Sequence, residues 1–332
     1  MREFQLYGLG NALVDIFIDL SDEELAPLGF EKGSMRLVGP DEQRALLGRF
    51  QSREPRLVSG GSVANSVIAF AQLGGAAAFL GCVGDDRYGL FYQSEFEELG
   101  IDFGNPPIVG ATTGTCVCLI TPDAERTMRT CLAVSSHLAA RHVDEARLKD
   151  ADWLFVEGYV FANPDTGQGA IREALRLARQ HGVKVAVTCS EAFVVQAFGT
   201  AFFEALKQTD LLFCNASEAR AVTGAESAEA AFARLRDEVP SAVVTDGANG
   251  VYVRHGGVEA HVPAYLCRPV DLTGAGDMLA GSFLYGLTHG VAPDRAARAA
   301  CYLAMKVITQ VGARLHHGAR HFWDECLNSP SR

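Results

Sequence analysis

The stretch DLTGAGDMLAGSFLYGL, residues 271–287, places three small residues directly before a carboxylate and then begins an apolar run with helical spacing. The first amides of a helix have no intrahelical partner and the aligned peptide dipoles are positive there, so a bare helix start attracts anions. Asp277 would repel such an anion unless it had a task of its own. The stretch therefore suggests an anion-binding turn with a base beside it.

Small side chains at 274–276 would let three successive amides converge on one oxyanion. Asp277 could then accept a proton from a hydroxyl that attacks the group held there. The pattern fits equally an aspartate that only interacts with the dipole in a helix's first turn. The dinucleotide-binding fingerprint needs a third glycine three residues after the Gly-x-Gly pair, and Leu279 stands there instead. The other Gly-x-Gly turn of the chain, GLGNAL at residues 8–13, has Leu13 at the same position.

Composition bounds the class of protein. The 332 residues suffice for one large α/β domain or two smaller ones, and 48 % of them are apolar. A net charge of −11 argues against nucleic acid as a partner. No apolar run reaches about 18 residues, so no membrane span is expected. An acidic protein that holds a polyphosphate needs local amides or a metal ion to offset the repulsion.

The nine cysteines include no CxxC pair. Their odd number and the absence of a signal peptide predict a reducing, cytoplasmic location. Cys116 and Cys118 form C-x-C within an alternating strand pattern, so both side chains should point to the same face. Two such thiols could bind a metal or could be small core residues.

After residue 150 the chain alternates between strand and helix patterns. The strand segments are WLFVEG, KVAVTC, DLLFCN and AVVTDG, and the helical segments between them are GAIREALRLARQHG, FFEALKQ and EAAFARLRDEV. This alternation predicts a parallel sheet that is covered by helices on both faces. The fold class is therefore α/β, a doubly wound and mostly parallel sheet.

A different rhythm marks GTCVCLITPDAERTMRTCL, residues 114–132, where two alternating strands meet at Pro122-Asp123 without a helix between them. This hairpin and the region after the first strand predict a small all-β piece. The predicted domains are a small lid at 15–58 and 109–135, and a large α/β catalytic domain at 1–14, 59–108 and 136–332.

Polar side chains or glycines stand at the ends of three further elements. They are Asn11 and Asp15 after the first strand, Gly60, Gly61 and Asn65 at the start of a helix, and Asn215 and Glu218 after a later strand. Asn65 lies on the side of its helix where a ligand would bind. The spacing of Asn215 and Glu218 also fits a helix N-cap and its box partner.

Taken together, these stretches resemble the ribokinase-like (PfkB) family of carbohydrate and nucleoside kinases. Its two signatures occur in order: Gly60-Gly61…Asn65…Gly74…Gly84 and Asp271-x-Thr-Gly-Ala-Gly-Asp277. The segments GNALVDI, EKGSMRLV, ERTMRT and VITQVGAR are similar to the adenosine-kinase branch, particularly its bacterial members. The resemblance implies a ribokinase-like fold with a small β-sheet lid.

The resemblance also implies a catalytic group and a substrate group. Asp277 would take the proton from the substrate's primary hydroxyl. Charge on the phosphoryl group would be stabilised by Gly274, Ala275 and Gly276, with Arg126 closing over the phosphate. The substrate contacts would be Asn11, Asp15, Gly60, Gly61 and Asn65. In this set the Asp15 carboxylate would accept bonds from two vicinal ribose hydroxyls.

For the cofactors, the resemblance implies ATP, Mg²⁺ and a monovalent cation such as K⁺. The ATP site would include Thr245, Gly247, Gly250 and Ala304. Asn215 and Glu218 would position Mg²⁺ through water, as hard oxygen ligands suit that ion. Asp271 and the Thr273 carbonyl would belong to the K⁺ site. No motif fixes the purine-stacking residues; Tyr159, Phe161 and Phe17 are candidates that could equally belong to the core.

The resulting hypothesis is ATP-dependent phosphorylation of the 5′-hydroxyl of a nucleoside, with adenosine as the first candidate. One alternative is a sugar kinase that acts on ribose or fructose. Another, of a different class, is a nucleotide-binding regulatory protein that has lost the reaction. A dinucleotide oxidoreductase is disfavoured by the missing third glycine. The chain would be a monomer or a homodimer that shares its lids through 109–135.

Overall fold

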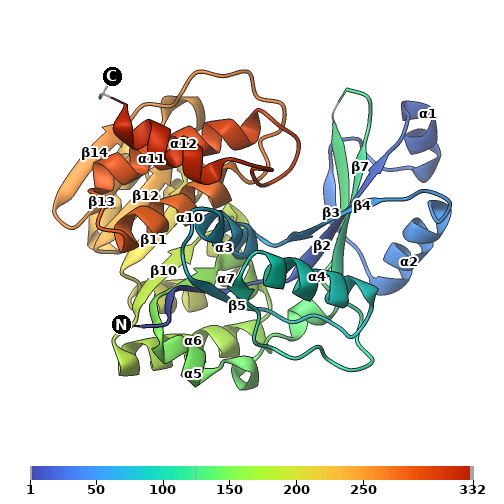
Figure 1. Cartoon of the computed structure of the whole chain (residues 1–332), viewed down its shortest axis with the longest axis horizontal. Coiled ribbons are helices and arrows are strands. Elements are labelled where there is room, and N and C mark those ends of the chain that lie inside the picture. Colours follow the sequence, from blue (N-terminus) through green and yellow to red (C-terminus); the bar gives the residue numbers. More distant parts are fainter. Residues whose placement is uncertain (1, 124, 330–332) are drawn as a thin grey trace.

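The computed structural model describes residues 2–123 and 125–329. Met1, Ala124 and 330–332, which fall inside the predicted domain ranges, lie outside the described residues. A small sheet projects from one side of a larger α/β body (Figure 1). Among the described residues, no helix combines the length and the hydropathy needed to cross a membrane.

The large sheet of the described chain has nine strands in the order β14-β13-β12-β11-β10-β9-β1-β5-β6. All neighbours from β12 to β6 are parallel, and only the β12–β13–β14 end is antiparallel. The mostly parallel sheet predicted from the sequence is confirmed. The strand bounds are β1 Phe4–Leu9, β5 Ala77–Leu80, β6 Ile101–Asp102, β9 Ala151–Glu157, β10 Lys184–Thr188, β11 Leu211–Asn215, β12 Ser241–Thr245, β13 Val251–His255 and β14 Val258–Val262.

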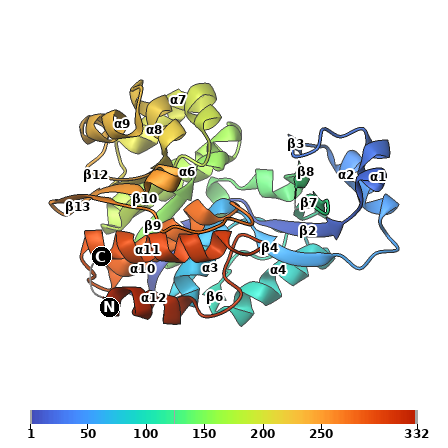
Figure 2. The ribbon, with the colours of Figure 1, turned by 90° about the horizontal axis from the view of Figure 1, so that it is seen from above.

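Helices cover both faces of this sheet (Figure 2). One face is covered by α3 Ser62–Gln72, α4 Arg87–Glu98, α10 Ala275–Thr288, α11 Pro293–Ile308 and α12 Ala319–Asn328. The other is covered by α5 Glu145–Lys149, α6 Gly167–His181, α7 Ala192–Leu206, α8 Ala216–Thr223 and α9 Ala228–Arg234. Each face of the sheet packs against its helices in a separate hydrophobic core, and successive strand residues point into opposite cores. Leu6 is buried in the core next to α3 and α10, and Tyr7 is buried in the core on the other face. Burial on both faces explains why these strands are continuously apolar.

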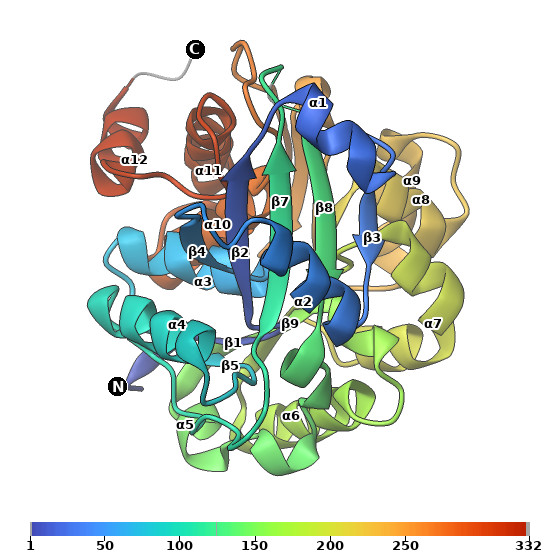
Figure 3. The same ribbon diagram turned by 90° about the vertical axis from the view of Figure 1, so that its right-hand side faces the viewer.

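The small sheet has the strand order β3-β8-β7-β2-β4 (Figure 3). Its strands are β2 Leu13–Asp19, β3 Met35–Leu37, β4 Arg56–Gly60, β7 Gly114–Ile120 and β8 Arg126–Cys131. The predicted hairpin at 114–132 is confirmed. The expectation of an all-β piece is wrong, because α1 Asp22–Leu25 and α2 Pro40–Arg49 interrupt it. Pro40 occupies the first turn of α2, where its missing amide hydrogen costs nothing.

The two faces of the small sheet differ. On the outer face, Ile16 and Val117 join the main core together with Leu46 of α2. The inner face consists of Asp15 and Phe17 of β2, Cys116, Cys118 and Ile120 of β7, and Arg126, Met128 and Thr130 of β8. Arg126 reaches from this face to Thr273 of the large body, so the inner face looks toward the start of α10.

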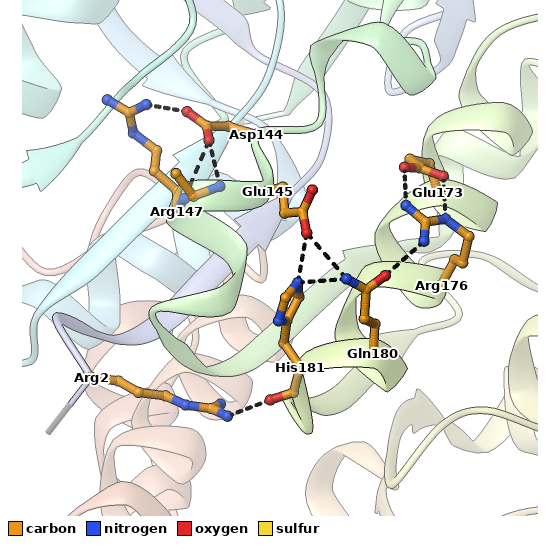
Figure 4. Close-up of polar contacts among 9 residues, drawn as sticks. Arg2, Asp144, Glu145, Arg147, Glu173, Arg176, Gln180 and His181 are labelled. Atoms are coloured by element: carbon orange, nitrogen blue, oxygen red, sulfur yellow. Dashed lines mark hydrogen bonds and ion pairs between the residues drawn. The ribbon is translucent and has the colours of Figure 1, made fainter.

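Far from this junction, a polar network joins α5 to α6 (Figure 4). The His181 ring lies 2.8 Å from Glu145, and Arg2 donates to the backbone carbonyl oxygen of His181 over 2.8 Å. Exposed ion pairs of this kind contribute about 0–1 kcal/mol each. The network links Arg2 and α5 to α6, and none of these residues lines the cavity described below.

Gly61 makes the turn from β4 into α3 with φ +114°, a conformation that side chains rarely adopt. A Cβ atom there would lie 2.0 Å from the Asn11 carbonyl oxygen. We expect Gly61→Ala to lower the free energy of unfolding by more than about 2 kcal/mol, measured by urea denaturation. Gly182→Ala is the control, because Gly182 has φ +63° but open space around its Cβ position. Its cost should stay near 1–2 kcal/mol; equal losses for both would contradict the steric argument.

Candidate active site

Helix α10 begins at Ala275, and Gly274 is its N-cap in a left-handed conformation with φ +78°. A Cβ at Gly274 would lie 2.2 Å from the Ala313 carbonyl oxygen, so the approach of the 313 backbone requires glycine here. Gly274 offers no side chain to cap the helix. The Ala275 amide donates to the Leu272 carbonyl oxygen over a long 3.4 Å, and the next amides of α10 keep their capacity to bind an anion.

Asp277 is the third residue of α10, and two side chains of α3 hold its carboxylate. The Ser62 hydroxyl donates to Oδ1 over 2.7 Å, and the Asn65 amide donates to Oδ2 over 3.0 Å. Removal from solvent raises the pKa of Asp277 to about 6, although both hydrogen bonds act to lower it. The carboxylate is thus fixed in direction and ready to take a proton near neutral pH.

A cavity of about 180 Å³ lies beside Asp277. Of the residues singled out from the sequence, the cavity lining includes Asn215, Glu218, Thr245, Gly276 and Asp277. These residues come from β11, α8, β12 and α10, which are far apart in the chain. The parallel sheet brings them together because the carboxyl ends of its strands lie at one edge.

Asn215 and Glu218 form the capping box that their spacing allowed. The Asn215 side chain accepts from the Glu218 amide over 2.9 Å, and Glu218 accepts from the Asn215 amide over 2.9 Å. Burial raises the pKa of Glu218 to about 7, and the charges of Glu191 and Asp277 add to this. The carboxylates of Glu191, Glu218 and Asp277 therefore lie close enough to act on one another.

Asp15 lies on the inner face of the small sheet, opposite Val58 of β4. A Cβ atom on Gly60 would lie 2.8 Å from the Asp15 carboxylate, so the glycine leaves room for it. Burial raises the pKa of Asp15 to about 6, while the guanidinium groups of Arg314 and Arg126 act to lower it. Arg314 is 8 % exposed and itself contacts Glu95 and the backbone of β4.

Glu157, at the end of β9, was not identified from the sequence. It is 1 % exposed and accepts hydrogen bonds from the Asn11 side chain over 2.6 Å and from the Val63 amide over 3.1 Å. It thereby joins the turn after β1 to the start of α3. Burial raises its pKa to about 7. A carboxylate that directly follows an apolar strand, as in WLFVEG, was the available signal.

Asn65 is 7 % exposed. Its amide group donates to Asp277, while its Oδ1 has no hydrogen-bond partner among the described residues. A buried acceptor without a partner is costly, so a donor from a bound molecule would be favourable at this position. Asn11, by contrast, is already bonded to Glu157 and to the Ser135 hydroxyl.

Arg126 joins the small sheet to the start of α10. It forms an ion pair with Asp271 and donates to the Thr273 hydroxyl over 2.9 Å. Asp271 also accepts from the Thr273 amide over 3.0 Å and from the Gly312 amide over 2.7 Å. The structure thus brings Arg126 to the glycine turn, as the hypothesis requires.

Other predicted residues lie apart from the cavity. Gly247 and Gly250 belong to the short turn between β12 and β13, and Ala304 lies on α11; none of the three lines the cavity beside Asp277. Phe161 is buried against Phe202 in the core and does not line the cavity beside Asp277.

A profile of the pfkB family carbohydrate kinases matches residues 34–317. The chain belongs to this family. It is 31 % identical to adenosine kinase from Sinorhizobium meliloti. The two structures superpose over 97 % of this chain and 99 % of that enzyme, with a TM-score of 0.87. A probable sugar kinase from Rhizobium etli CFN 42 is 30 % identical, and the match covers 98 % of this chain and 99 % of that protein with a TM-score of 0.88. Adenosine kinase from Saccharomyces cerevisiae is 28 % identical over 92 % of this chain and 95 % of its own.

As a pfkB kinase, the protein is a phosphotransferase with a hydroxyl acceptor. The ribokinase-like architecture and the adenosine-kinase-like branch expected from the two signatures are confirmed. Family membership also implies ATP as the phosphoryl donor and a small molecule as the acceptor.

Proposed function

We propose that the protein phosphorylates the 5′-hydroxyl of a nucleoside with ATP, and that adenosine is its substrate. The observation that carries the nucleoside assignment is the inner face of the small sheet, where Phe17, Ile120 and Met128 share one face with Asp15. An apolar surface next to a diol-binding carboxylate suits a base attached to ribose. The similarity to adenosine kinases over nearly the whole chain supports the same assignment.

In this proposal Asp277 takes the proton from the 5′-hydroxyl as its oxygen attacks the γ-phosphorus. Ser62 and Asn65 keep the carboxylate aimed at that hydroxyl. The amides at the start of α10 and the Arg126 guanidinium stabilise the charge of the transferred group. Asp15 and the free Oδ1 of Asn65 accept hydrogen bonds from the sugar hydroxyls. Thr245, Gly247, Gly250 and Ala304 belong to the proposed ATP site.

The residues around the cavity fit a divalent cation. Burial and the negative charges of Glu191 and Asp277 raise the pKa of Glu218, so added positive charge would be favourable there. Asn215 and Glu218 already bond one another, which favours holding Mg²⁺ through water. When bound, Mg²⁺ neutralises phosphate charge. The residues proposed for K⁺ fit less well, since Asp271 is already engaged by Arg126 and two amides, and no step is assigned to that ion.

A coupled ADP-release screen across nucleosides and free sugars tests the proposal. We expect adenosine to be turned over with a kcat/KM at least tenfold above that for ribose or fructose. A preference for a free sugar would overturn the nucleoside assignment and support the second candidate, a sugar kinase, which the similarity to the probable sugar kinase of Rhizobium etli favours. If ADP is released at the same rate whether or not a nucleoside or sugar is added, both the nucleoside-kinase and the sugar-kinase assignments would be contradicted.

Activity should depend on pH through the carboxylates of Asp277 and Asp15, both with pKa values raised to about 6. Each must be ionised to act, so the rate should be full above about pH 7 and fall as the pH drops through 6. Ser62→Ala removes a hydrogen bond that stabilises ionised Asp277. The pH at which the rate falls should therefore rise by roughly one unit. Ser66→Ala is the control, since Ser66 donates to the Ser62 backbone instead. Identical profiles for both variants would refute the assigned contact.

We also propose a cytoplasmic location. All nine cysteines are free thiols, eight of them buried, which fits a reducing compartment.

A further inference from the structure

The paired thiols of Cys116 and Cys118 have no part in the phosphoryl transfer proposed above. Both project from β7 onto the inner face of the small sheet, and their sulfur atoms lie 3.6 Å apart. In the parallel register Asp15 is directly beside Cys116. A carboxylate oxygen of Asp15 and the two sulfurs all lie within 4.8 Å of one another.

This spacing matches the donor set of a thiophilic cation. Two thiolates at about 2.3 Å from a tetrahedral Zn²⁺ lie about 3.8 Å apart, close to the observed separation. An Asp15 carboxylate oxygen within 4.8 Å of both sulfurs supplies the third donor. We propose that Asp15, Cys116 and Cys118 form a binding site for Zn²⁺ or a similar thiophilic divalent cation, and that the bound ion blocks the sugar-binding carboxylate.

Two guanidinium groups near the three donors favour the complex. Each thiol loses its proton to the solvent when it binds as a thiolate, so Zn²⁺ with two thiolates and one carboxylate carries a net charge of −1. Arg126 and Arg314 both act on Asp15 and would stabilise that charge. The Thr130 hydroxyl, 3.2 Å from the Cys116 sulfur, orients one ligand from outside the coordination shell. A water molecule would complete the tetrahedron.

The inhibition rests on the proposed function, because only a sugar-binding Asp15 makes the ion a competitor. Occupied by Zn²⁺, the Asp15 carboxylate no longer accepts the vicinal hydroxyls. The apparent KM for the nucleoside should then rise about tenfold when free Zn²⁺ is about nine times its Kd, with kcat unchanged.

Metal binding is tested first, without an activity assay. Chelator-treated full-length protein is titrated with Co²⁺ and then with Zn²⁺ against a chromophoric chelator. We expect one equivalent to bind and Co²⁺ to give thiolate charge-transfer absorption in the near ultraviolet. Cys116→Ser/Cys118→Ser should lose both signals. Cys131→Ser, on the outer face of the same hairpin, should keep both. Equal binding by the double variant, or none by the wild type, would overturn the site.

Steady-state kinetics with Zn²⁺ then test the inhibition. Compared with its own metal-free KM, the double variant should lose the Zn²⁺ sensitivity, and the single variant Cys118→Ser serves if the double variant unfolds. Metal binding without a change in KM would overturn the blocking of Asp15. If the protein phosphorylates no nucleoside even without Zn²⁺, the proposed function fails, while the Co²⁺ spectrum still decides the site.

Discussion

Asp277→Asn is expected to reduce kcat by about 10²–10⁴ or more while ATP binding stays nearly unchanged, because the amide cannot accept the proton of the substrate hydroxyl. The fold should not suffer. The raised pKa of Asp277 means that the folded state disfavours its charge, so losing the charge costs no stability above pH 6. Single-turnover measurements with saturating ATP would give the loss in the chemical step, and circular dichroism would report the fold.

The matched control for this variant is Asp294→Asn. Asp294 also lies in the first turn of a helix, α11, but does not line the cavity beside Asp277. If Asp277 served only the helix dipole, both substitutions would have the same small effect, about 0.3–1 kcal/mol on stability and none on turnover. Turnover that survives in Asp277→Asn would show that another group is the base.

Much of the large body was predictable because its signals are local. The strands β9, β10 and β11 have apolar centres, and each is followed in the chain by a helix, which is what burial between two helical layers requires. The small sheet was harder to predict. Helix α2 has only two buried residues, Gln43 and Leu46, so its periodicity is faint and the segment was taken for β-structure.

The candidate site shows the same division. Gly274 and Asp277 are marked by the chain itself, since a bare turn and a carboxylate adjoin in the sequence. Glu157 acts on Asn11 and Val63 across more than ninety positions, a contact that only the folded sheet creates. Arg314 is a single charge in a turn, with no pattern to show that it reaches β4 and Glu95.

Substitution of Asp15 should have the second-largest effect on catalysis. In Asp15→Asn one acceptor oxygen becomes a donor, so the two hydroxyls of the ribose no longer find a matched carboxylate. Hydrogen bonds to a charged group contribute about 1.5–3 kcal/mol each. Losing one of them and reducing the other to a neutral hydrogen bond lowers kcat/KM by about 10–10³, mainly through KM. Initial rates over a range of nucleoside concentrations would separate the two constants.

Two comparisons make this outcome specific to Asp15. Asp19→Asn changes an exposed carboxylate four residues along the same strand and the same face, and should leave KM within twofold of the wild type. Nucleosides that lack the 2′- or 3′-hydroxyl should bind the wild type more weakly than the complete nucleoside does. In Asp15→Asn the same analogues should bind almost as well as the complete nucleoside, because the bond between residue 15 and that hydroxyl is already absent. If the deoxy analogues lose as much affinity in the variant as in the wild type, Asp15 does not bind those hydroxyls. The diol contact would then have to come from other residues near Asp277, with Asn65 as the first to test because its Oδ1 is buried without a partner among the described residues.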